Sequence, residues 1–167
     1  MKTALSNNIM RAGKHYASFE SFKYFRSGYE NSVMMGVMRP GQANTKAIGY
    51  PFYNIFYDHF SQNTGHGECN NNNNVQCCMY YAANGASYFS DWAGSNENEI
   101  SWEGMETMSF DDELGMLLDL DEGTLSVYKN GRKLGVIKSG LAGPYCWVVS
   151  MQVGAHVGIK RGTIPPN

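Results

Sequence analysis

Residues 114–137 read LGMLLDLDEGTLSVYKNGRKLGVI, and this stretch decides the fold. Apolar runs of strand length are separated here by two turn signals, Asp121-Glu122-Gly123 and Asn130-Gly131. Asn-Gly is the preferred pair for a two-residue type I′ turn, because both central positions need a positive φ. The stretch therefore predicts three consecutive antiparallel strands, over 114–120, 124–129 and 132–137.

The two-residue turn also predicts how the second and third of these strands pair. With Asn130-Gly131 as the loop, Val127 lies opposite Leu134 and Leu125 lies opposite Val136. All four apolar side chains then share one face of the sheet, where they pack across the strands. The turn and the apolar pattern thus predict the same buried face.

The same kind of pattern continues on both sides of this meander. Over 14–22 the side chains of Ala17 and Phe19 alternate with those of Tyr16 and Ser18, as in a half-buried strand. Asn84-Gly85 is a second hairpin signal. Further strands are expected over 33–38, 75–81, 87–89, 146–151 and 155–160, with short edge segments over 100–102 and 107–110. The pattern predicts an all-β domain of two packed antiparallel sheets.

The composition agrees with this fold class. The chain has 19 Gly and 16 Asn but only 8 Leu, and 13% of its residues are aromatic. Such a mixture is typical of short strands joined by tight turns. A length of 167 residues predicts one domain over 1–167, with its core over about 12–164. The net charge of −2 argues against a nucleic-acid binder, which needs a surplus of Lys and Arg.

One long insert interrupts the strand pattern, over about 41–75. It is rich in Asn, Gly and aromatic residues and ends in the run Asn70 to Asn74. A connection this long is uncommon unless it is functional or disordered. We expect the part near 51–60 to pack on the body of the domain, and the Asn run to form a mobile tip.

The sequence gives no sign of a membrane span or a secretory signal. No segment approaches the roughly 20 apolar residues that a transmembrane helix needs. The adjacent Cys77 and Cys78 point to opposite faces of a strand and so cannot pair with each other. Few, clustered cysteines favour a reduced, intracellular setting, and we expect the cytoplasm.

The motifs along the chain resemble those of the SPRY domain, the core of the B30.2 module. They are 13–19 (GKHYASF), 36–39 (GVMR), the meander over 111–136, and 143–150 (GPYCWVVS), in the family's order and over roughly 12–164. The overall sequence, with its long Asn- and Tyr-rich insert, is also similar to that of uncharacterised SPRY-domain proteins of diatom-like algae. Family domains usually begin with a strand before the motif at 13–19. Only about ten residues precede it here, which suggests a fragment of a longer protein.

The resemblance implies a bent β-sandwich that serves as a protein-interaction module, such as an adaptor or substrate-recognition domain. In the family, loops at one edge of the sandwich bind peptides or protein surfaces, without catalysis, cofactor or metal. By position, the resemblance maps this surface to residues after the second strand, around the middle strands and between the last two strands. They are Arg39, Pro40, Tyr88, Ser90, Asp91, Trp92, Met151 and Gln152. Relatives that bind peptides often carry an aromatic residue where this chain has Met151 and Gln152.

Other functions compete with this interpretation. A scaffold subunit could dock through the insert, and a lectin-like sandwich could bind sugar through Asp91, Trp92 and the Asn-rich loops. Asp119-Leu120-Asp121 briefly resembles the start of a calcium loop, but the Gly comes one position early, so a solvated hairpin turn is favoured. His66 and Cys69 have the spacing of zinc ligands, but Cys77 and Cys78 in a strand cannot readily face one ion with them.

Overall fold

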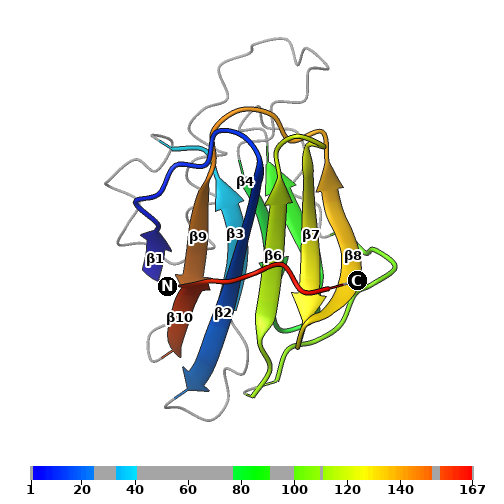
Figure 1. The fold of residues 1–167 in the computed structure, drawn as a ribbon. Coiled ribbons are helices and arrows are strands. Elements are labelled where there is room, and N and C mark those ends of the chain that lie inside the picture. The colour runs from blue at the N-terminus through cyan, green and yellow to red at the C-terminus, as the bar shows by residue number, and fades with distance from the viewer. Residues whose placement is uncertain are drawn as a thin grey trace, which may run out of the picture.

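The computed structural model describes residues 2–24, 33–40, 77–90, 100–109, 111–151 and 155–166. These residues form two five-stranded antiparallel sheets that pack face to face (Figure 1). The first sheet has the order β1 (Lys2–Leu5), β9 (Cys146–Met151), β3 (Val33–Met38), β4 (Cys77–Tyr81) and β5 (Ser87–Ser90). The second has the order β10 (Ala155–Arg161), β2 (Lys14–Tyr24), β6 (Leu114–Asp119), β7 (Thr124–Lys129) and β8 (Arg132–Ser139). The predicted all-β sandwich is confirmed.

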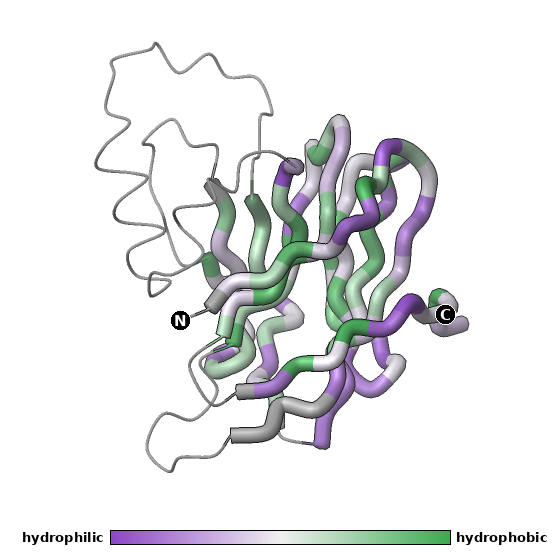
Figure 2. Tube along the Cα trace, turned by 90° about the vertical axis from the view of Figure 1, so that its left-hand side faces the viewer, coloured by the Kyte–Doolittle hydropathy of each residue, from purple (hydrophilic) through white to green (hydrophobic). Residues whose placement is uncertain are grey.

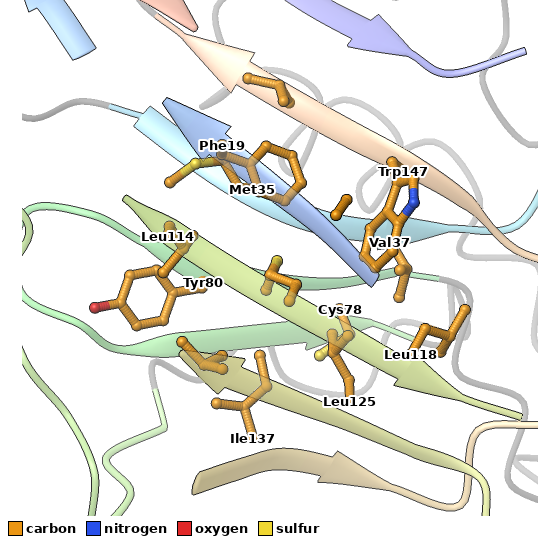
Figure 3. Packing of buried hydrophobic residues seen from close by; sticks show 14 of the residues in the cluster. Phe19, Met35, Val37, Cys78, Tyr80, Leu114, Leu118, Leu125, Ile137 and Trp147 are labelled. Atoms are coloured by element: carbon orange, nitrogen blue, oxygen red, sulfur yellow. The ribbon is translucent and has the colours of Figure 1, made fainter. Parts of the chain in front are cut away.

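The core lies between the two sheets and is built by alternate residues of the strands. Figure 2 shows hydrophobic residues concentrated along the strands. Ala17 and Phe19 of β2 are buried on the inner face, as the alternation predicts. Phe19 meets Trp147 of β9 edge to face, with ring centroids 6.0 Å apart. Figure 3 shows this packing with side chains from both sheets, among them Met35, Val37, Cys78, Tyr80, Leu114, Leu118, Leu125 and Ile137.

The turn of the β7–β8 hairpin is confirmed, but its predicted register is wrong. Lys129 lies opposite Arg132, and the two residues between them, Asn130 and Gly131, have φ values of 51° and 79°. Beyond the turn, however, Val127 lies opposite Gly135 rather than Leu134. β8 contains bulges, and each extra residue reverses which side chains face the core.

The consequence of the bulges is seen at the end of β8. Val136 lies opposite Ser126 and is 43% exposed, although the simple register buries it. Ile137 takes the inner position and is 7% exposed. The ring of Trp102 lies against Gly135, where an added Cβ would come within 3.1 Å of its Cζ3 atom. The sequence pattern alone did not account for this packing partner.

Two further differences from the predicted strands concern the N-terminal residues and the two short edge segments. The first strand, β1 (Lys2–Leu5), was missed, and it pairs with β9. The strand that the resemblance requires before the motif at 13–19 is therefore present. The two predicted edge segments are not regular strands, since Ile100 makes only a single bridge with Ser87 and residues 107–109 are irregular.

The described residues of the segment 100–113 are irregular and bond to both sheets at one end of the sandwich, and we call them the clip. On the side of the first sheet, the Tyr80 hydroxyl donates to the Glu106 carbonyl, and Trp102 Nε1 donates to the Gly85 carbonyl at 2.8 Å. On the side of the second sheet, Arg132 pairs with the Glu106 carboxylate at 2.7 Å. Residue 110 of this segment lies outside the described residues. The clip occupies this end of the sandwich and leaves the opposite end to other loops.

The insert over 41–75 lies outside the described residues, so its expected packing and mobile tip stay predictions. Within the described ranges, no helix has the length and apolar character needed to cross a membrane.

Candidate partner-binding surface

Three connections interlock at the end of the sandwich opposite the clip. Residues 10–13 precede β2, 120–123 join β6 to β7, and 140–145 join β8 to β9. The backbones of the first and third exchange two hydrogen bonds between Met10 and Tyr145, at 2.8 and 2.9 Å. The middle connection bonds to both others, through Leu120 to Gly13 and through Gly123 to Leu141, each at 2.9 Å. We call this the Arg39 end, because Arg39 follows β3 at the same place.

The Arg39 side chain is held against this frame. Its guanidinium lies over the ring of Tyr145, 5.1 Å from the centroid, and donates a hydrogen bond to the Ala142 carbonyl. Gly143 beneath it has a φ of 91°, and an added Cβ there would come within 2.6 Å of an Arg39 nitrogen. Burial raises the pKa of the Tyr145 hydroxyl, and the Arg39 charge acts in the opposite direction. The result is a half-buried cation in a fixed position.

The carboxylates of Asp119 and Asp121, in the turn beside these connections, bind groups of the protein itself. One oxygen of Asp119 accepts the backbone N–H groups of Asp121 and Glu122, both at 3.1 Å, and the other lies 2.9 Å from Lys14 Nζ. Hydrogen bonding by Lys14 holds the pKa of Asp119 below its usual range. Asp121 accepts the N–H of Gly13 at 3.1 Å. These contacts are those of a structured hairpin turn.

A second cation, Lys138, lies near this end and contacts an aromatic ring. Lys138 of β8 places its ammonium group 3.9 Å from the centre of the Phe89 ring in β5. This contact links the open edges of the two sheets, since β8 and β5 are the last strands of their sheets. The one weak sequence signal for it is a lysine that directly follows the apolar residues Val136 and Ile137 in the same strand.

The structure brings together some of the predicted site residues and separates others. Arg39 and Pro40 lie at the Arg39 end, directly after Met38. Ser90 is the last residue of β5 and lies opposite Cys77, which also lies opposite Met38, so its backbone is at the same end. Asp91 and Trp92 follow Ser90 in the sequence but lie outside the described residues.

The remaining predicted residues lie elsewhere. Tyr88 is half-buried on the outer face of the first sheet, where it meets Tyr81 edge to face at 6.2 Å. Met151 lies opposite Val33, at the other end of β9 from Cys146, which is about 17 Å away along a six-residue strand. Gln152 lies outside the described residues.

Three of the four cysteines lie in strands that the structure describes, namely Cys77, Cys78 and Cys146. Cys78 packs in the central core and Cys77 in a separate cluster on the outer face, so the predicted opposite orientation is confirmed. Both thiols and that of Cys146 are free and buried. Burial raises the pKa of Cys78 to about 12. The other residues of the possible zinc set, His66 and Cys69, lie outside the described residues. Among the described residues, no three metal-ligating side chains are grouped to hold an ion.

The arrangement of these strands occurs in known proteins. No protein-family model matches the chain, and no curated protein matches it. Among solved structures, it is similar to the SPRY domain of human HERC1, with a TM-score of 0.60 and 17% identity, covering 95% of this chain and 81% of that one. The fold is that of an SPRY domain. A second SPRY structure, the TRIM65 PSpry domain, has a TM-score of 0.55 and 16% identity, covering 96% of this chain and 70% of that one.

The TM-scores and coverages of these comparisons establish the SPRY fold, and function has to be argued from the site itself. The resemblance read from the motifs is confirmed at the level of architecture. The finer similarity to algal proteins stays a prediction.

Proposed function

We propose that this chain is a non-catalytic protein-interaction domain that binds a peptide or protein partner through the loops of the Arg39 end. The observation that carries the proposal is the position of the Arg39 guanidinium, stacked on Tyr145 and anchored by the Ala142 carbonyl. Arginine is enriched at the energetic centres of protein interfaces, because its planar group combines charge, hydrogen bonding and stacking. A side chain that is already ordered also loses little entropy when a partner binds.

The surroundings of Arg39 support the same surface. Exposed Ala142 and Gly143 leave backbone beside the guanidinium accessible to a partner. Pro40 is half-buried next to it, and Ser90 ends β5 at the same level of the sheet. We include Asp91 and Trp92 in the proposed surface because they follow Ser90 directly in the sequence. The chemistry favours a partner segment that brings a carboxylate to Arg39 and an apolar side chain beside it.

Met151 does not belong to this proposed surface, since it lies at the opposite end of β9. The first sheet carries a different feature on its outer face, a cluster of Met34, Met38, Cys77, Met79 and Val148. The strands β3 and β4 of this cluster are joined by residues 39–76, which include the insert. A scaffold role through the insert therefore remains the second candidate function.

The test is affinity capture from the source cells followed by mass spectrometry. Wild type is compared with Arg39→Ala, and with Arg132→Ala as a matched control that removes the β8 arginine paired with Glu106 at the other end of the sandwich. We expect a partner that wild type and Arg132→Ala retain and that Arg39→Ala loses at least tenfold. Arg39→Lys keeps the charge but not the planar stack, and we expect it to bind at an intermediate level.

Thermal unfolding of each variant shows whether a loss of binding reflects a loss of folding. Folded Arg39→Ala that retains every partner would contradict the proposed surface and favour the insert. A rise in melting temperature on adding calcium alone would instead favour the lectin-like alternative.

A further inference from the structure

The outer face of the second sheet carries an aromatic cluster that is buried although it faces away from the core. Tyr16 of β2, Leu117 of β6 and Tyr128 of β7 are 8%, 9% and 2% exposed and form their own group. The rings of Tyr16 and Tyr128 meet edge to face, with centroids 5.6 Å apart. Gly115 lies directly below, where any Cβ would overlap the Tyr16 hydroxyl. The sequence therefore leaves room for Tyr16 to lie along the sheet. We call this surface the Tyr16 face.

The segment that follows β10 crosses the Tyr16 face. Figure 1 shows residues 162–166 running in front of β2 and on toward β7, and Figure 2 shows the same segment on the outer side of the second sheet. Gly162 donates its N–H to the Tyr16 carbonyl at 3.3 Å. A Cβ at Gly162 would lie 2.8 Å from two carbons of the Tyr16 ring, so backbone and ring are in direct contact. The segment thus begins on the aromatic cluster.

The attachment of this segment becomes weaker beyond Gly162. Gly162 makes the last backbone hydrogen bond of the described chain. Ile164 is 43% exposed, while Pro165 is half-buried. Two consecutive prolines, Pro165 and Pro166, favour an extended chain and have no N–H to donate. Beyond Gly162 the described segment therefore crosses the face without strand pairing.

We propose that the Tyr16 face is a second binding surface, which takes an extended, proline-containing apolar segment of a partner protein in place of the chain's own residues 163–166. Extended proline segments bind aromatic-lined surfaces readily, because their backbone is already ordered. The chain's own segment occupies the surface as an intramolecular ligand, at the high effective concentration that a short tether gives. A partner segment must therefore compete with it. This surface is separate from the Arg39 end.

The test uses the full chain and a fluorescent peptide with the sequence of residues 161–167, RGTIPPN, measured by fluorescence polarisation. The triple variant Ile164→Gly/Pro165→Gly/Pro166→Gly loosens the resident segment without touching the sheet. We expect this variant to bind the peptide at least tenfold more tightly than wild type. A peptide with both prolines replaced by glycine is expected to bind at least tenfold more weakly.

Two further measurements locate the binding on the Tyr16 face. Leu117→Lys in the triple variant should abolish binding, whereas Met105→Lys, which adds the same charge at an exposed apolar residue of the clip, should not. Because Leu117→Lys can also disturb folding, the NMR signals of the Tyr16 and Tyr128 rings provide the second readout, and they should shift when the triple variant is titrated. Equal binding by wild type and triple variant, no binding by either, or unchanged tyrosine signals would overturn the proposal. None of these outcomes depends on Arg39, so the two surfaces are tested independently.

Discussion

The dipeptide Asn-Gly turns this chain twice, and the two turns are built differently. At Asn130-Gly131 both residues have positive φ, and the strands leave the turn as a two-residue hairpin. At Asn84-Gly85 only Gly85 does, with a φ of 77°. There the turn is longer, since Tyr80 pairs with Ser87 across it.

The surroundings of the two turns explain the difference. Gly131 has no neighbouring atom within 4 Å of where a Cβ would lie, so no packing constrains this position. The contacts of this turn are hydrogen bonds that join Asn130 to Asp112 and Glu113, at 2.7 to 2.9 Å, and they leave the two-residue form unchanged. Gly85 is buried against the backbone of Glu106, and its carbonyl accepts the indole N–H of Trp102. The Asn84 side chain accepts the N–H of Ala86 at 2.9 Å, which replaces a bond that a tighter hairpin would make. The comparison teaches that an exposed turn follows its dipeptide, while a buried turn follows its packing partners.

Gly85→Ala is expected to cause the largest loss of stability. The new methyl group would overlap Glu106 backbone atoms, and the positive φ adds strain for any residue with a Cβ. Together these effects should lower the free energy of unfolding by about 3 kcal/mol. Urea denaturation of the variant beside wild type measures this. A loss no greater than that of Gly131→Ala would show that the contact between Gly85 and Glu106 is not formed.

Trp102→Phe should have the next largest effect. The substitution removes the donor to the buried Gly85 carbonyl and part of the ring that packs on Gly135. An unsatisfied buried carbonyl together with lost packing should cost about 2 kcal/mol. The same denaturation experiment applies. In the double variant with Gly85→Ala the two losses should fall short of their sum, because both act on one contact; full additivity would contradict the coupling.

Gly131→Ala should have a smaller effect, although its φ of 79° is almost the same as that of Gly85. Only the cost of the left-handed conformation applies, which is about 1 kcal/mol. The difference between the two glycine variants therefore measures the contribution of packing alone. Gly131→Asn serves as a control, since Asn tolerates this conformation better than Ala, and it should recover part of the loss.

The smallest effect is a change in acid sensitivity at the exposed turn. Burial raises the pKa of Asp112, but hydrogen bonds from the Ser109 N–H and Asn130, each at 2.7 Å, and Lys129 at 3.1 Å outweigh it, so the pKa lies below its ordinary value. The stability that these contacts give is complete above that ordinary value and is lost as the pH falls through the lowered pKa.

Asp112→Asn should therefore make the free energy of unfolding fall less steeply with pH between about pH 5 and pH 3. Denaturation at several pH values measures the slope, and Asp111→Asn, at an exposed neighbour, is the matched control. Identical slopes in Asp112→Asn and wild type would mean that Asp112 carries no lowered pKa in the folded protein.

The candidate site was less predictable than the fold, for a physical reason. The sequence placed Arg39 and Pro40 correctly after a strand, and it suggested that loops at one edge meet. It gave no sign that Tyr145 would lie beneath the guanidinium or that Ala142 would hold it, because these residues are more than 100 positions away. It also grouped Met151 with residues that lie at the opposite end of the sheet, since position along the chain does not reveal which end of a strand faces which loop.

The sequence by itself determined the strands β2 to β10, the two hairpins, the inner face of β2 and the opposite orientation of Cys77 and Cys78. All of these depend on local backbone preference and on the two-residue period of a strand, both of which are written in neighbouring residues. Tertiary structure alone decided the bulges of β8, the form of the Asn84-Gly85 turn, the pairing of β1 and the covering of the Tyr16 face. Each of these depends on a contact between segments far apart in the chain, where packing and buried hydrogen bonds outweigh local preference.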